Sequence, residues 1–263
     1  CVAFIIESSL AQDALPSSKP ATPINPIVGI VDAFETHSVV ALGEGDHGNE
    51  QGHAFRLELI RDPRFTTVVD DIVVEFGNSL YQDVMDRFVN GEDVSYAELS
   101  RVWQNTTQAH AIWDRPIYEE FFRAVRDINS TLPKDGRLRV LLGDAPIDWD
   151  EVRTLEDIRK VGRSDSIPAG IIQREVVAKG RRALIIYGDM HYVRRNMYWR
   201  MQDEDAAEKR FAAPVDSIVA NLERAGIKVF SIRTTFADLT PLQADIASWQ
   251  APKLPVVGGT TLG

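Results

Sequence analysis

The residues most able to do chemistry are concentrated in one short stretch, residues 38–56. Its apolar run, residues 39–42, predicts a buried strand, and a helix is predicted over residues 49–61. The turn between them has the sequence G-E-G-D-H-G-N-E. Glycines permit a tight turn, and a histidine beside a carboxylate can take a proton at neutral pH. Glu44 and His47 are therefore expected to face one spot as an acid–base pair.

The same turn also fits G-x-G-x-x-G, the pattern of a dinucleotide-binding loop between a strand and a helix. In that interpretation Glu75, near the end of the next strand, would bind the ribose. However, Glu44 and Asp46 would repel phosphate groups in a partly dry site. The polar residues after Gly48 also do not suit close helix–strand packing. Capping of the next helix is a simpler alternative, but a single acid would be enough for it. The charge of the turn favours an acid–base site.

The rest of the chain alternates short apolar runs with helical patterns, which predicts an α/β domain. We expect a mostly parallel five-stranded sheet flanked by helices, with the site at the carboxyl ends of the strands. Strands are predicted over residues 38–43, 66–76, 137–142, 183–187 and 228–232. Helices are predicted over residues 27–34, 49–61, 79–89 (capped by Ser79), 117–128, 168–179 and 215–225, with a shorter one after Ser95 and another within 150–165. Four strand ends carry titratable residues, namely Glu44 with His47, Glu75, Asp144, and Asp189 with His191.

His47 is the candidate general base, and either Glu44 or Glu75 would orient it and stabilise its protonated form. Arg56, on the next helix, can hold a carboxylate or stabilise an oxyanion. His191 could protonate a leaving group. The structural alternatives are a buried Glu75–Arg56 pair and a helix-capping role for His191.

Three further residues are candidates for substrate binding. Asp144 ends the third predicted strand, and His53 is close to helical phase with Glu50 on the helix that also carries Arg56. The aromatic residues are expected in the core or in a pocket wall, and they are Trp103, Trp113 and Tyr118. His110 is assigned no role.

The G-E-G-D-H-G-N-E turn, with Arg56 on the next helix and Glu75 ending the second strand, resembles the erythromycin esterase-like group. That group belongs to a wider set that includes haem-binding ChaN-like proteins and Tiki-type proteases. The resemblance is specific over residues 38–80, and residues 188–191 (G-D-M-H) resemble the C-terminal histidine of the group. It implies a hydrolase that cleaves an ester or lactone without an obligatory cofactor, in a cleft lined by Glu44, His47, Arg56, Glu75 and His191. The chain lacks the long helical insertion that walls the macrolide pocket, so a macrolide substrate is not expected.

A metal- or haem-binding protein is the alternative class, either a metal-dependent peptidase or a haem-uptake protein. Nitrogen and oxygen ligands suit zinc, manganese or iron. If a divalent metal is bound, its ligands are expected to be Glu44, His47, Glu75 and His191. The sequence has no tight ligand spacing such as H-E-x-x-H. A bound metal and loss of activity on chelation would distinguish the two classes.

The chain has 263 residues and a net charge of −10, which argues against nucleic acid or an anionic membrane as a partner. A small-molecule substrate is expected instead, and no stretch is apolar and long enough to span a membrane. The apolar start and the Ser-Leu-Ala form of residues 9–11 predict a signal-peptide remnant, hence export to the periplasm or outside the cell. We expect a remnant and linker over 1–26, the α/β domain over 27–248 and a loose tail over 249–263. The sequence does not indicate an oligomeric state.

Overall fold

The protein is described by a computed structural model that covers residues 23–108, 112–162, 164–194, 215–233 and 254–255. The chain divides into two units. The smaller one contains β1 (Pro23–Ile24) and β7 (Leu254–Pro255), which pair antiparallel. The larger one, residues 30–238, contains the sheet and the candidate site. The predicted signal-peptide remnant (residues 1–11), most of the predicted linker and tail, and His110 lie outside the described residues.

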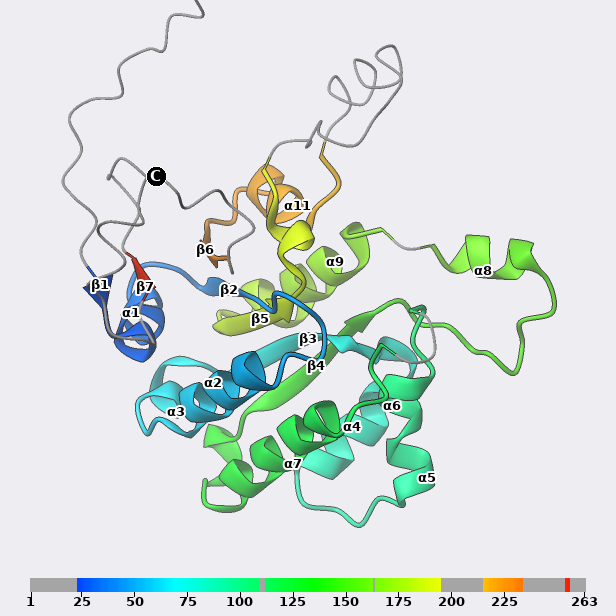
Figure 1. Cartoon of the computed structure of the whole chain (residues 1–263), viewed down its shortest axis with the longest axis horizontal. Helices are drawn as coiled ribbons and strands as arrows, with labels where there is room; N and C mark the ends of the chain where they lie inside the picture. The colour runs from blue at the N-terminus through cyan, green and yellow to red at the C-terminus, as the bar shows by residue number, and fades with distance from the viewer. Residues whose placement is uncertain (1–22, 109–111, 163, 195–214, 234–253, 256–263) are drawn as a thin grey trace, which may run out of the picture. The chain divides into compact units, whose positions relative to one another are not determined.

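The sheet of the larger unit has five strands in the order β4-β3-β5-β2-β6, and all neighbours are parallel (Figure 1). The predicted fold class is confirmed. The central strands β2, β3 and β5 are buried along their whole length, as expected for a parallel sheet covered on both faces. The strands are β2 (Val39–Gly43), β3 (Asp71–Asn78), β4 (Arg139–Asp144), β5 (Ala183–Tyr187) and β6 (Val229–Ile232).

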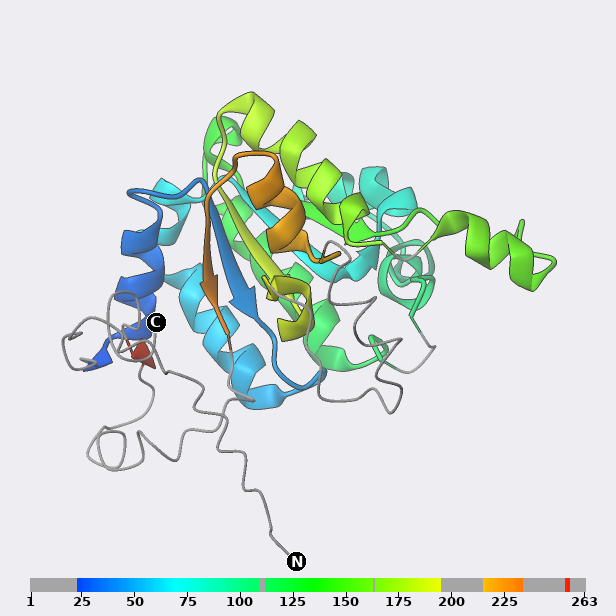
Figure 2. The ribbon, with the colours of Figure 1, turned by 90° about the horizontal axis from the view of Figure 1, so that it is seen from above.

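Helices cover the two faces of this sheet in two groups (Figure 2). The first group follows β2 and β3 along the chain, and the second follows β4 and β5. The first group is α2 (Glu50–Arg61), α3 (Phe65–Val68), η1 (Ser79–Tyr81), α4 (Gln82–Val89), α5 (Tyr96–Leu99), α6 (Arg101–Gln104), α7 (Pro116–Ser130) and η2 (Lys134–Gly136). The second is α9 (Ser166–Glu175), η3 (Val177–Lys179), η4 (Asp189–Tyr192) and α11 (Ile218–Arg224). α8 (Leu155–Val161) has no buried residue and extends away from the sheet (Figure 1), and α1 (Pro26–Ala33) precedes β2. None of the described helices is apolar over enough residues to cross a membrane.

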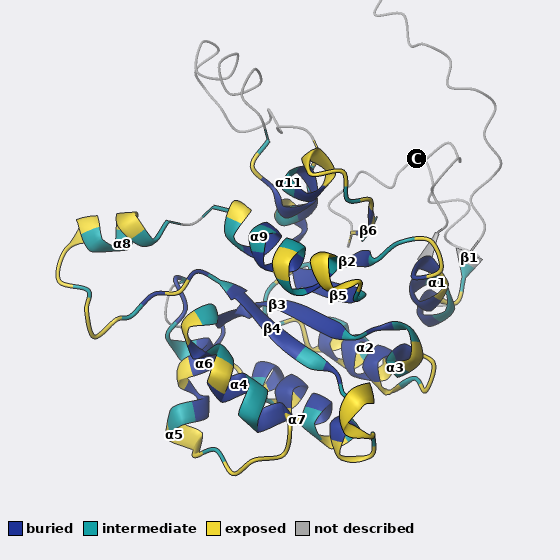
Figure 3. Ribbon diagram, turned by 180° about the vertical axis from the view of Figure 1, so that it is seen from behind, coloured by how far each residue is buried: buried dark blue, intermediate teal, exposed yellow. Residues whose placement is uncertain are grey.

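The strands of the sheet are largely buried (Figure 3). Because side chains alternate along a strand, alternate residues contribute to the cores on the two faces. Val73, Ile185 and Tyr187 belong to the core formed with α9 and α11. On the other face, Phe76 packs against an aromatic group contributed mainly by α7, at ring-centroid distances of 4.7–6.1 Å. That group is Trp113, Tyr118, Phe121 and Phe122. The expectation of a core or wall position for these aromatics is confirmed by the burial of Trp103, Trp113 and Tyr118.

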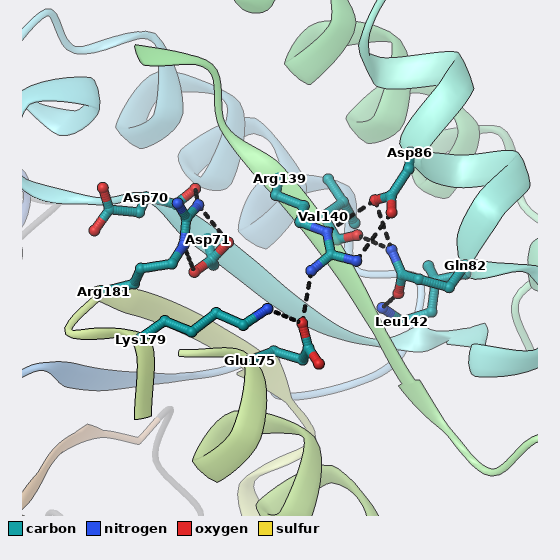
Figure 4. Close-up of polar contacts among 10 residues, drawn as sticks. All are labelled: Asp70, Asp71, Gln82, Asp86, Arg139, Val140, Leu142, Glu175, Lys179 and Arg181. Atoms are coloured by element: carbon teal, nitrogen blue, oxygen red, sulfur yellow. Dashed lines mark hydrogen bonds and ion pairs between the residues drawn. The ribbon is translucent and has the colours of Figure 1, made fainter. Parts of the chain in front are cut away.

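Ion pairs lie at the amino-terminal ends of β3, β4 and β5, where they link β3 to the segment before β5 and β4 to two helices (Figure 4). Arg139 contacts both Asp86 of α4 and Glu175 of α9, at 2.9 Å each. Arg181 contacts Asp71 through two hydrogen bonds of 2.7 and 2.8 Å. These ion pairs therefore stabilise the amino-terminal end of the sheet, opposite to the predicted site.

Several predicted boundaries are wrong. Residues 65–68 form helix α3 and not the start of a strand, because Asp62 accepts hydrogen bonds from the amides of Arg64 and Phe65 and turns the chain. α9 begins two residues before Pro168. The helix after β3 is capped by Asn78, whose side chain accepts from the Leu80 amide, and not by Ser79. Residues 137 and 138 precede β4.

Candidate active site

Three adjacent strands bring the predicted site residues to one edge of the sheet. Because β5 lies between β3 and β2, the segments after Gly43, Val74 and Tyr187 are neighbours. Glu44 continues the pairing of β2, since its amide donates to the Tyr187 carbonyl at 2.8 Å. Strands alone therefore bring the first turn and the last histidine together.

Glu75 lies at an irregularity of β3. Three residues of this strand, 75–77, stand opposite the single residue Gly143 of β4. The pairing of β3 with β5 ends at Val74, the residue before Glu75. Such bulges re-aim side chains next to active sites, and here the Glu75 carboxylate accepts a hydrogen bond of 2.8 Å from the Gly188 amide.

Two positions of the first turn require glycine, one because of a close contact and one because of its backbone conformation. A Cβ atom at Gly43 would lie 1.7 Å from Oδ1 of the buried Asp189. Gly48 has φ of +78°, which favours glycine, and its amide donates to the Tyr118 hydroxyl at 2.9 Å. The turn is thus held against α7 and against the segment after β5.

Glu44 and His47 form the expected pair. Nδ1 of His47 lies 3.0 Å from Oε2 of Glu44, which is only 3% exposed. The other Glu44 oxygen, Oε1, accepts from the Tyr118 hydroxyl at 3.0 Å and contacts Nη1 of Arg56 at 3.3 Å. Burial lowers the pKa of His47, but the Glu44 hydrogen bond and the charges of Glu75 and Glu44 outweigh burial and raise this pKa above its ordinary value. Arg56 therefore pairs with Glu44 among the described residues, and not with Glu75 as in the structural alternative.

His191 is held between two carboxylates. Its Nε2 lies 3.2 Å from Oε1 of Glu75, and its Nδ1 lies 2.7 Å from Oδ1 of Asp165. Burial opposes the charge, but the Asp165 and Glu75 contacts prevail and raise the pKa of His191 to about 10. Burial raises the pKa of Glu75, while the more numerous contacts with His191, the Gly188 amide and His47 lower it overall. At neutral pH His191 is thus a charged acid.

The two histidine pairs meet at Gly188. A Cβ atom built there would lie 3.4 Å from Cε1 of His47, 3.6 Å from Oε2 of Glu75 and 3.7 Å from Cδ2 of His191. The predicted convergence of residues from three strand ends is therefore present in the structure. Because Gly188 has no side chain, the space bordered by the two histidine rings and Glu75 stays open.

The predicted substrate-binding residues lie in different places. Asp144 accepts hydrogen bonds from the Thr107 amide and hydroxyl, and it lines a cavity together with Glu75 and His191. His53 is buried in α2, where its Nε2 contacts Glu120 of α7 at 3.1 Å. Glu50 is exposed in the first turn of α2. Among the described residues, neither His53 nor Glu50 forms a hydrogen bond or ion pair with the His47 and His191 pairs.

Two partners of the histidine pairs were not assigned from the sequence. Asp165 precedes α9, and its Oδ2 also accepts from the Ile218 amide at 3.2 Å. Tyr118 donates to the Glu44 carboxylate, whereas the sequence indicated only a core or pocket-wall position for it. Trp113, expected in the same way, contacts the His47 ring at a centroid distance of 4.5 Å. Nothing in the local sequence of Asp165 indicates its partner, since 26 residues separate it from His191.

The donor set fits a small divalent ion in part. One ligand atom each from Glu44, His47 and Glu75 lies within 4.8 Å of the others. However, Arg56 already contacts Glu44, and the protonated His191 already contacts Glu75. His191 would have to give up that contact to act as the fourth predicted ligand. The adjoining cavity of about 60 Å³ has room for a few waters.

Comparison with known proteins supports the fold. No protein-family model matches this sequence, and no curated protein is significantly similar to it. Among solved structures, ChaN of Campylobacter jejuni, described with cofacial haem binding, has a TM-score of 0.50 at 12% identity over 82% of this chain and 88% of that chain. A Pasteurella multocida toxin with a thiol-protease-like triad in its C-terminal region has a TM-score of 0.48 at 10% identity, over 80% of this chain.

This chain spans only a quarter (25%) of the toxin chain. The type III effector HopBA1 has a TM-score of 0.40 at 15% identity, over 68% of this chain and 79% of that chain. At these identities the likeness to ChaN concerns the fold alone. The chain is an α/β protein similar in fold to ChaN.

Proposed function

We propose that this protein is a hydrolase that cleaves an ester or lactone with water activated by His47, in the manner implied by its resemblance to erythromycin esterases. The observation that carries the proposal is the meeting of two unlike histidine pairs at Gly188. One histidine, His191, is charged at neutral pH, while His47 is paired with a single carboxylate. Titratable groups in different environments are typical of acid–base sites.

The hydrogen bonds assign the base role to His47. With Nδ1–H donating to Glu44, the lone pair is on Nε2, which can accept a proton from water. Tyr118 and Arg56 fix the Glu44 carboxylate, so the His47 ring keeps one orientation and one tautomer. The water oxygen then attacks the carbonyl carbon, and the proton of the water moves to His47.

His191 supplies the opposite function. As the bond to the leaving alkoxide breaks, the imidazolium donates a proton to that oxygen, and its charge stabilises the oxyanion that precedes this step. Glu75 and Asp165 keep the ring protonated until that moment. The small cavity beside His191 supports a small ester or lactone as the substrate.

The test is a panel of small esters, lactones and peptides, assayed with the full chain before and after treatment with a chelator. We expect cleavage of at least one ester or lactone, and we expect it to survive chelation. Inactivity on every class would contradict the proposal.

A metal-dependent peptidase or haem-binding protein is the second candidate, favoured by the three clustered ligand atoms and by the fold of ChaN. A divalent ion at this cluster would activate water or polarise a carbonyl. Glu44, His47 and Glu75 would hold it. Metal analysis of the purified protein and a haem titration followed by absorbance distinguish this candidate, because stoichiometric uptake without ester cleavage would favour it.

A further inference from the structure

A small cavity adjoins the candidate site on the α9 side of the sheet. Its volume of about 60 Å³ is enough for roughly four to six waters at about 10–15 Å³ each. It is therefore the size of one small functional group. Its polar lining includes Glu75, Thr107, Asp144, Asp165, Tyr187 and His191.

The described lining of this cavity carries more negative than positive charge. Three carboxylates line it, and His191 is the one cation among the described lining residues. Glu75 and Asp165 are both paired with that histidine. Asp144 has no ion pair among the described residues, and its carboxylate accepts hydrogen bonds from the amide and hydroxyl of Thr107 and from the Ala145 amide. Burial raises the pKa of Asp144, so its carboxylate is stabilised by any cation that enters.

Tyr187 is an independent sign of a missing ligand. The residue is 2% exposed, and its hydroxyl has no hydrogen-bond partner within the described part of the chain. That hydroxyl lies 1.7 Å from where a Cβ of Gly143 would be, and Gly143 and Tyr187 both line the cavity. Buried hydroxyls are normally paired. Because burial raises the pKa of Tyr187 well above its ordinary value, the group stays a neutral phenol that can accept a hydrogen bond.

We propose that this cavity is a specificity subsite for a protonated primary amine of the substrate, bound by the Asp144 carboxylate and the Tyr187 oxygen. A primary ammonium donates three hydrogen bonds from one small head. It therefore fits the volume, the excess of negative charge and the unpaired acceptor together. The inference rests on the proposed hydrolase function, and it narrows the substrate class to small amine-bearing esters.

Matched ester pairs test the inference. Methyl esters of alanine, β-alanine and γ-aminobutyrate place the amine at increasing distance from the carbonyl, and in each neutral partner a methyl group replaces the ammonium. We expect kcat/KM to favour at least one amine over its neutral partner by roughly tenfold or more, since hydrogen bonds to a buried charge have that strength. Equal kcat/KM for every pair would overturn the subsite while leaving the hydrolase function in place.

Two variants remove the proposed contacts. Asp144→Asn keeps the shape and an acceptor for Thr107 but loses the charge, and Tyr187→Phe removes only an unpaired hydroxyl, so it is expected to fold at least as well. Both should reduce the preference for the amine. Asp150→Asn makes the same chemical change at an exposed residue outside the cavity, and it should leave the preference unchanged.

Binding is measured separately from hydrolysis. Calorimetric titration of the full chain with propylammonium chloride, against potassium chloride and propanol as controls, is expected to show binding that Asp144→Asn weakens. This arm decides the inference even if no ester is cleaved. Binding that is absent, equal for potassium, or unchanged in Asp144→Asn would overturn it.

Discussion

At the scale of single residues, His47 is the group on which hydrolysis depends. His47→Gln keeps a polar side chain beside Glu44 but removes the proton acceptor. We expect a loss of turnover of about 10²–10⁴-fold, typical of a positioned acid–base group, with little change in thermal stability because the His47 side chain is 34% exposed. The measurement is kcat on the best ester together with a melting curve.

The control for this variant is His37→Gln. His37 contacts Phe230 and the Ala33 carbonyl, and it precedes β2, at the opposite strand end from the site. Its variant should keep normal turnover. If His47→Gln also keeps normal turnover while folding normally, His47 is not the base.

Asp165 should set the charge of His191. Asp165→Asn retains an acceptor for Nδ1 but removes a negative charge, so the pKa of His191 should fall from about 10 toward the ordinary value of about 6.5. Between about pH 6.5 and about pH 10, His191 of the wild type keeps its proton, whereas His191 of the variant loses it as pH rises. Histidine NMR shifts against pH measure this directly. An unchanged titration of His191 would contradict the assigned role of Asp165.

At the scale of elements, the carboxylate of Glu175 links α9 to β4 through Arg139 and to η3 through Lys179. The hydrogen bonds from Lys179 and Arg139 lower the pKa of Glu175 below its ordinary value. A lowered acid pKa contributes stability above the unfolded-state value, and that contribution is lost as pH falls through the folded-state value. The window therefore lies at and below the ordinary glutamate value of about 4.3.

Glu175→Gln should consequently destabilise the fold at neutral pH by no more than about 1 kcal/mol, because these pairs are partly exposed. The wild type and the variant should converge in acid. Urea unfolding at several pH values measures the difference, with the exposed Glu151→Gln as the control. A difference that persists unchanged below the folded-state pKa would point to packing and not to charge.

At the scale of the whole molecule, the net charge of −10 should prevent binding to polyanions at physiological salt. Fluorescence anisotropy with a labelled DNA duplex and co-sedimentation with anionic vesicles are expected to show no association. Saturable, salt-sensitive binding to either would contradict this prediction and would indicate a local basic surface that the total charge conceals.

The sequence determined the features that depend on neighbours along the chain. Apolar runs and glycines are local signals, so the α/β class, the turn at residues 43–49 and the polar strand ends were predictable. Boundaries were less so, because residues 66–68 have strand-forming side chains but form α3 under the control of Asp62. Local propensity is weaker than such tertiary and turn contacts.

Only the tertiary structure decided which of these residues act together. The order β3-β5-β2 arises from packing between segments remote in sequence, and it places His191 beside Glu75 and not beside Glu44. It also brings Asp165 to His191 and Tyr118 to Glu44, across 26 and 74 residues. The periodicity of the sequence does not predict such pairings, because they depend on how whole helices pack on the sheet.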